Sequence, residues 1–175
     1  ACAQGAYIIW NHPGWPDDKS TLYPVHEELL KANKIHGVEV LNHKEYYPVA
    51  FDWCNQYGIA PMANTDIHDL VSGDYGWGGG KMRPMTLVFA TERSEKGIKE
   101  ALFARRTAAL FDNKLVGKSE YLMKLIQSSL KIRRINAGTI EVTNISDIPY
   151  EMTNGGKLYL FPCRSGLSES VGTGG

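Results

Sequence analysis

The sequence predicts an α/β fold in which an incomplete barrel precedes a small antiparallel β module. Two observations predict it: strand and helix patterns alternate up to residue 111, and a hairpin signal follows after residue 117. Alternating strands and helices are typical of a parallel sheet or barrel. A complete eight-unit barrel needs roughly 250 residues. The chain has 175 residues, so we expect only part of a barrel.

Short apolar runs mark the strands of the expected barrel. They lie at residues 6–10, 37–41, 59–63, 85–90 and 107–111. A continuous apolar run of this length is typical of a strand that is buried on both faces.

Three helices are expected between these strands. The first spans residues 24–34, because Pro24 suits a first helical turn and apolar side chains then recur on one face. The second spans residues 48–57, where Gly58 stands in the position of a C-terminal stop. Ser94 can cap the third. Cys54 falls on the apolar face of the second helix and is expected to be a small buried side chain.

The pattern changes after residue 117. A helix is expected at 119–129, followed by strands at 130–135 and 139–145 that are joined by the hairpin signal Asn136-Ala137-Gly138. A further strand is expected at 158–161, and the Ser- and Gly-rich end of the chain predicts disorder. We therefore divide the chain into three parts, the barrel part at 1–116, the helix and β module at 117–162, and a disordered tail at 163–175.

Composition argues against two classes of partner. Lys+Arg and Asp+Glu are equal at 19 each, and no dense basic block occurs, so no nucleic acid is expected. The apolar runs are far too short for a membrane span. The three cysteines show no CxxC spacing and do not form a disulfide framework.

The segment Asn64-Thr65-Asp66-Ile67-His68 is the strongest candidate for chemistry. Asp66 and His68 are two residues apart, directly after the apolar run at 59–63, so both side chains can point to the same side. A carboxylate and an imidazole at the end of a strand are suitable ligands for a divalent metal ion. The alternative is an Asp that caps a turn beside a partly exposed His.

Four other residues are candidates for the same site. His12 follows the strand at 6–10, and His43 follows the strand at 37–41. The alternatives are a solvent-facing His12 where the strand gives way to a loop, and a solvated loop histidine, which explains His43 equally well. Glu39 lies inside its strand, where a carboxylate is costly unless it is paired. It faces either the pocket or a covering helix. Arg83 could hold an anionic substrate such as phosphate, or it is an exposed surface residue.

Aromatic residues also gather near these strand ends. They could line a pocket, although core packing explains them nearly as well. They are Trp10, Trp15, Tyr46 and Tyr47.

The order of these motifs along the chain resembles that of the PHP (polymerase and histidinol phosphatase) superfamily. The matching stretches are residues 5–15, 36–42 and 63–68. The region 83–102 also resembles the bacterial phosphoesterase branch, and the resemblance extends over about residues 5 to 130. It implies a distorted, TIM-like (β/α)7 barrel that hydrolyses phosphoesters. Such a barrel binds up to three divalent ions, usually zinc, manganese or iron.

The resemblance also implies roles for the candidate residues. His12 matches a metal ligand of the family, and Asp66 and His68 match its closing Asp-x-His, whose members serve different ions of one cluster. These two are therefore the expected catalytic residues. Glu39 matches an acid near the pocket that is not usually a ligand, and we group it with His43 and Arg83 as substrate-binding.

One family motif is missing. No His-x-His occurs in the chain, whereas the family begins with one. The chain therefore resembles the C-terminal portion of a phosphoesterase that lacks its N-terminal ligands, and we expect it to be inactive alone on a small phosphorylated substrate.

Two alternatives remain open. The first is a non-catalytic remnant or interaction module that self-associates through the open barrel edge. The second is another barrel metal hydrolase, similar to amidohydrolases. The location of the protein, bacterial and either cytoplasmic or periplasmic, is also left open.

Overall fold

The computed structural model describes residues 1–76, 82–154, 157–161 and 168–172. The chain divides into two units, Ala1–Tyr121 and Leu122–Gly175. The boundary lies within helix α5 (Ser119–Ser129), close to the change of pattern in the sequence at residue 117.

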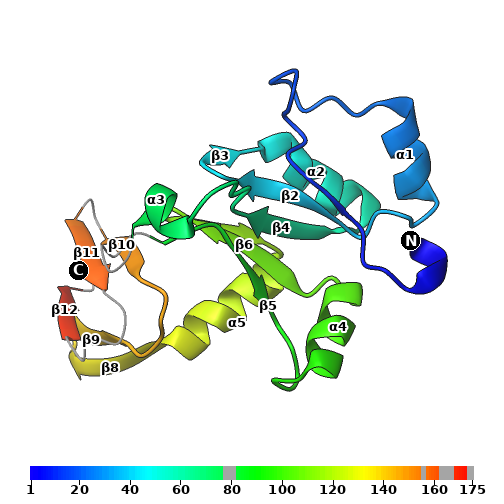
Figure 1. Ribbon diagram of the computed structural model, residues 1–175. Coiled ribbons are helices and arrows are strands. Elements are labelled where there is room, and N and C mark those ends of the chain that lie inside the picture. The colour runs from blue at the N-terminus through cyan, green and yellow to red at the C-terminus, as the bar shows by residue number, and fades with distance from the viewer. Residues whose placement is uncertain (77–81, 155–156, 162–167, 173–175) are drawn as a thin grey trace. The chain divides into compact units, whose positions relative to one another are not determined.

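The first unit is built on a sheet with a parallel centre (Figure 1). Strand β2 (Gly37–Asn42) pairs in parallel with β1 (Ile9–Trp10) and with β4 (Ala60–Asn64). The short strand β3 (Glu45–Tyr46) returns antiparallel beside the end of β2. Every residue of β2 is buried, as its continuous apolar pattern predicts. The C-terminal ends of β1, β2 and β4 therefore meet at one edge of the sheet.

A second, antiparallel sheet continues the first unit. It consists of β5 (Met85–Val88), β6 (Thr107–Phe111) and β7 (Lys114–Gly117), in that order. Threonine side chains connect this sheet to β4: the Thr86 hydroxyl bonds both the N–H and the C=O of Ala63 at 2.9 Å, and Thr107 donates to the C=O of Pro61 at 2.8 Å.

This second sheet corrects one expectation. The strands at 85–90 and 107–111 were expected to extend a parallel barrel, but β5 and β6 run antiparallel. No closed sheet occurs among the strands of the described residues. What the structure shows is a mixed α/β unit.

Helices cover the sheets of the first unit. The 3-10 helix η1 (Cys2–Gln4) opens the chain, and α1 (Pro24–Lys31) follows β1. Helix α2 (Pro48–Tyr57) lies against β2 and β4 (Figure 1). Helix α3 (Val71–Tyr75) follows β4, and α4 (Glu95–Phe103) joins β5 to β6.

The helix ends follow local chemistry. Gly58 ends α2 in a left-handed conformation, and the Ser94 side chain accepts the N–H of Gly97 at the start of α4, both as expected. Helix α1 stops three residues before the expected position 34, and Asn33 has a positive φ of 52°. The buried Cys54, only 3 % exposed, confirms its expected place in the core.

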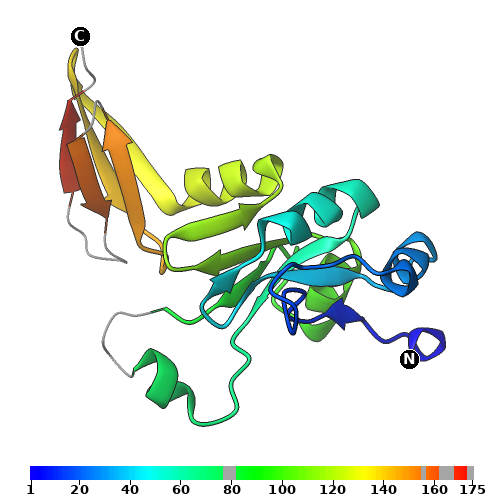
Figure 2. The ribbon, with the colours of Figure 1, turned by 90° about the horizontal axis from the view of Figure 1, so that it is seen from above.

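The second unit contains two small antiparallel sheets, coloured yellow to red in Figure 2. In one sheet, β9 (Thr139–Asn144) lies between β8 (Leu130–Asn136) and β12 (Ser168–Gly172). The other is the hairpin of β10 (Tyr150–Asn154) and β11 (Lys157–Phe161). Leu130 and Val142 form a small core, against which other apolar side chains pack.

The β8–β9 connection confirms the predicted hairpin, because Asn136 pairs with Thr139 across it. The tail differs from the expectation of disorder over 163–175. Residues 168–172 form β12, which gains its backbone partners from β9. Residues 163–167 and 173–175 lie outside the described part of the chain. None of the described helices is long and apolar enough to cross a membrane.

Candidate active site

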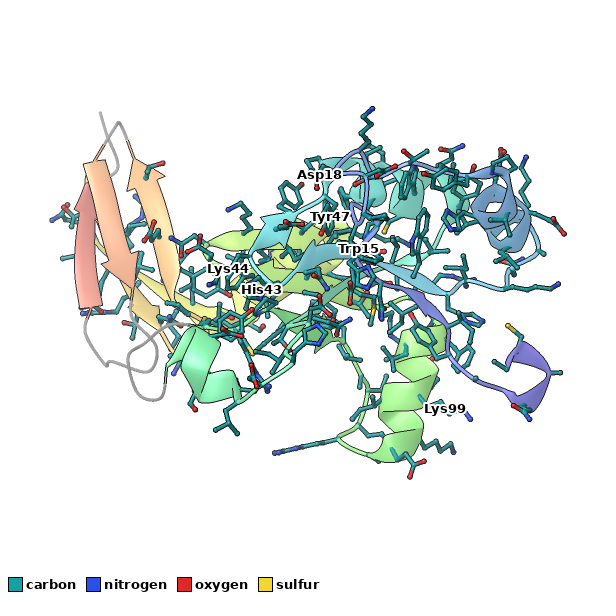
Figure 3. All side chains as sticks on the ribbon, turned by 45° about the horizontal axis from the view of Figure 1, so that its top comes forward. Trp15, Asp18, His43, Lys44, Tyr47 and Lys99 are labelled. Carbon is teal, nitrogen blue, oxygen red and sulfur yellow. The ribbon has the colours of Figure 1, made fainter. Side chains whose placement is uncertain are left out.

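A pocket of about 550 Å³ lies at the C-terminal ends of β1, β2 and β4. Ligands of α/β proteins commonly bind at this edge of a parallel sheet. Figure 3 shows Trp15, His43 and Tyr47 at this edge. The lining residues are His12, Trp15, Asn42, His43, Glu45, Tyr47, Asp66, His68, Asp69 and Asp74.

The structure brings together four of the six candidate residues. His12, His43, Asp66 and His68 all line the pocket, although they come from three separate strand ends. Arg83 is exposed and does not line it. Glu39 is 1 % exposed and lies beneath the pocket, not in its lining.

Three of the lining residues have unusual backbone conformations. His12, His43 and Asp66 have positive φ angles of 30°, 50° and 50°. Such angles are uncommon for residues other than glycine, and strained conformations cluster at functional sites. Each of these residues follows a strand end by one or two positions, so the chain turns sharply there and presents the side chain at the pocket.

Asp66 and His68 form a loose, accessible pair. Their Oδ1 and Nε2 atoms are 3.7 Å apart, and their side chains are 39 % and 86 % exposed. No described residue donates a hydrogen bond to the Asp66 carboxylate, so the turn-capping alternative has no support in the described contacts. Both residues line the pocket.

Glu39 accepts three hydrogen bonds in the interior. Its Oε2 accepts the backbone N–H of His12 at 2.5 Å and the side-chain amide of Asn42 at 2.8 Å. Its Oε1 accepts the side-chain amide of Asn64 at 2.7 Å. All three partners are neutral, so Glu39 does not form the ion pair with a covering helix that was the alternative.

Tyr75 and Tyr47 support the walls of the pocket. Tyr75 is buried, and its hydroxyl lies 3.3 Å from Nδ1 of His43. Burial raises the pKa of Tyr75, with smaller contributions from the charges of Asp74 and Asp66. Burial also raises the pKa of Tyr47, whose hydroxyl donates to Glu45. Both phenols therefore stay protonated near neutral pH and act as hydrogen-bond donors.

The lining is rich in metal-ligand chemistry and poor in cations. It holds carboxylates and imidazoles, and no Lys or Arg is found among its described residues. Oxygen and nitrogen donors of this kind suit zinc, manganese or iron. The donor atoms are thus of the types that bind a divalent ion. The donor set is incomplete in number, because no three His, Cys, Asp or Glu side chains of the described residues are placed to hold one ion.

Sequence reasoning missed several residues of this site. Asp69 and Asp74 lie beyond the motif at 64–68, and no spacing links them to it. Glu45 belongs to a two-residue strand that has no sequence signal. Asn64 belongs to the motif, but its sequence position alone predicts no role for it. Trp15 and Tyr47 line the pocket, and Tyr47 also belongs to the buried core. Trp10 packs against that core and stacks on Trp53, with ring centroids 4.8 Å apart.

Comparison with known proteins gives one informative likeness. The sequence matches no protein-family model and no curated protein. The structure is similar to the crystal structure of a two-domain protein from Bacteroides vulgatus ATCC 8482 that contains a predicted PHP-like metal-dependent phosphoesterase. The TM-score is 0.84 and the sequence identity is 32 %. The match covers 98 % of this chain and 54 % of that chain, so this chain spans about half the length of its neighbour.

Proposed function

We propose that this chain is the C-terminal portion of a PHP-like metal-dependent phosphoesterase and supplies part of its metal site. One observation carries the proposal: His12, Asp66 and His68, which match ligands of that family, line a single pocket. The likeness to a solved structure that contains such a predicted phosphoesterase supports the same general kind of function.

In this proposal Asp66, His68 and His12 hold divalent ions. Asp66 supplies a hard oxygen donor, and the histidines supply nitrogen donors. A bound ion would neutralise the phosphate of the substrate. The described lining residues include no Lys or Arg for that purpose, while carboxylates such as Asp69 and Asp74 would repel an anion. In this proposal the whole protein, and not this chain alone, determines the identity and the number of the bound ions.

His43 is proposed to contact the substrate. Its Nδ1 faces the hydroxyl of Tyr75, so its Nε2 is the ring nitrogen left for a ligand. Arg83 is exposed and outside the lining, so the proposal gives it no contact. The remaining ligands, and the strands that would complete a distorted barrel, are proposed to lie in the part of the parent protein that corresponds to the unmatched half of the neighbour.

The test is a hydrolysis assay with aryl phosphate monoesters and diesters, with added manganese or zinc. We expect little or no turnover from this chain alone. We expect metal-dependent turnover from the longer protein, abolished by a chelator and by Asp66→Asn. Turnover of amide substrates instead would favour the amidohydrolase alternative. A longer protein without any hydrolysis would contradict the proposal.

A self-associating, non-catalytic module is the second candidate. Among the described strands, β1 pairs only with β2, so one edge of the sheet lacks a strand partner. Open edges of this kind favour pairing between chains. Size-exclusion chromatography with light scattering separates the two candidates, since a stable dimer that binds no metal would support this one.

A further inference from the structure

Glu39 joins the ends of three strands through its two carboxylate oxygens. The N–H of His12 follows β1, Asn42 ends β2, and Asn64 ends β4. The carboxylate is 1 % exposed and is not in the pocket lining, so it cannot touch a substrate there in this conformation. A buried carboxylate is costly unless its lone pairs are used, and here both oxygens accept hydrogen bonds.

The hydrogen bonds lead directly to the residues that line the pocket. One holds the backbone of His12, whose φ of 30° is unfavourable for a histidine. Another holds Asn64, two residues before Asp66, and the Asn64 carbonyl also accepts the N–H of His43 at 3.0 Å. A single side chain therefore connects the three segments that carry His12, His43 and Asp66.

We infer that Glu39 is a positioning residue, which fixes the separation between His12 after β1 and Asp66 after β4, on either side of β2. This assignment replaces the substrate contact expected from the sequence. It rests on the proposed function only for the identity of the ligand that the pocket receives. The geometry itself requires no bound ion.

The hydrogen-bond chemistry selects the variants. Each of the three partners donates to Glu39, so Glu39→Met keeps the length of the side chain while removing both carboxylate oxygens and leaving only a weakly accepting sulfur. Glu39→Gln keeps one carbonyl oxygen, which can still accept the His12 N–H, and Asn64 can turn its amide to match. Val38→Ala is the matched control, because Val38 is a neighbour in β2, is 0 % exposed and takes no part in this network.

Hydrogen exchange of the 15N-labelled chain, followed by NMR, measures the effect without any metal. In Glu39→Met the His12 amide should exchange about tenfold faster or more than in Val38→Ala, as loss of a hydrogen bond to a charged group predicts. Glu39→Gln should restore most of its protection. Asn64→Ala should shift the resonances of Asp66 and leave the His12 amide protected.

Two outcomes would overturn the inference. One is equal His12 exchange in Glu39→Met and Val38→Ala, since Glu39 would then act only through general stability. The other is a His12 amide in Glu39→Met that exchanges at the wild-type rate, together with unchanged Asp66 resonances. A manganese titration of the same samples separates this result from the proposed function. A wild-type chain that does not respond to manganese contradicts the metal site, while the exchange data still decide the role of Glu39.

Discussion

The pocket depends on a few residues whose backbone or side-chain geometry leaves little freedom. Gly14 is one of them, because it follows His12 and lies directly against the ring of Tyr47. A Cβ at this position would clash with Cε1 of Tyr47 and would lie 3.0 Å from its Cδ1. The absence of a side chain at Gly14 therefore lets the loop after β1 close over the wall of the pocket.

Gly14→Ala should lower the free energy of unfolding of the first unit by about 1–3 kcal/mol, since the Tyr47 ring must move. Urea unfolding followed by tryptophan fluorescence measures it, because all four tryptophans precede Tyr121 in the chain. Gly73→Ala is the control. A Cβ at Gly73, on helix α3, would meet no atom within 4 Å, and alanine favours a helix. Equal effects of the two variants would contradict the packing argument.

His36 makes stability depend on pH. Its Nδ1 accepts the N–H of Ile8 at 2.9 Å, which requires an unprotonated nitrogen. Burial lowers the pKa of His36 from 6.5, and the charge of Arg105 adds to this. The unfolded chain therefore binds a proton more readily than the folded one. The contribution of His36 to the free energy of unfolding is present above pH 6.5 and is lost as the pH falls through that value.

His36→Asn keeps an acceptor for Ile8 and removes the titrating group. The difference in unfolding free energy between wild type and this variant should change as the pH falls from 7.5 to 5 (~2.5 pH units around the ordinary histidine pKa). The wild type should lose more stability over this interval. Parallel curves for the two proteins would show that His36 does not cause the dependence.

At the level of elements, side-chain hydrogen bonds connect β4 to the second sheet. Thr107 is fully buried and donates to the carbonyl of Pro61. Pro61 has no N–H to donate to a ladder, and its carbonyl accepts the hydroxyl of a threonine on the second sheet, so this bond ties β4 to β6.

Thr107→Val keeps the shape of the side chain and removes its hydrogen bond to the Pro61 carbonyl. It should cost about 1–3 kcal/mol of unfolding free energy. Thr91→Val, at an exposed position, should change stability by less than about 0.5 kcal/mol. Urea unfolding of both variants checks this. A Thr107→Val protein as stable as wild type would mean that the two sheets do not depend on this bond.

Local patterns predicted the elements that are defined by local chemistry. Residues 48–57 form a helix because their apolar spacing and Gly58 specify both its face and its end. The direction in which strands pair was not predictable in this way, because β5 would have the same apolar pattern in a parallel or an antiparallel sheet. Strand β12 was missed because its Ser- and Gly-rich sequence gains order only by pairing with β9.

The candidate site was predictable where a residue directly follows a strand. His12, His43 and Asp66 meet because parallel strands end at one edge, and this topology follows from the alternation of strands and helices. The role of Glu39 was not predictable, since a strand pattern does not tell which donors surround a buried carboxylate. Asp69 and Asp74 reach the pocket through the loop and helix after β4, for which the sequence has no signal.

At the level of the whole molecule, the chain brings carboxylates and imidazoles from three strand ends together at one pocket. It spans about half of the solved structure that it resembles, and no described group of three donors can hold an ion. We therefore expect weak binding of a divalent ion by this chain. A measurement that detects weak and local binding is needed to test the central claim.

That measurement is paramagnetic line broadening of the histidine ring signals during a manganese titration. The signals of His12 and His68 should broaden first. Those of His36 should persist, because it lies at the other end of β2, roughly 20 Å away by the rise of a strand. Asp66→Asn should remove the selective broadening. Asp18→Asn should leave the selective broadening unchanged, because Asp18 has a positive φ like Asp66 but lies outside the pocket lining. Equal broadening of all histidines, or selective broadening that persists in Asp66→Asn, would contradict a metal site at these strand ends.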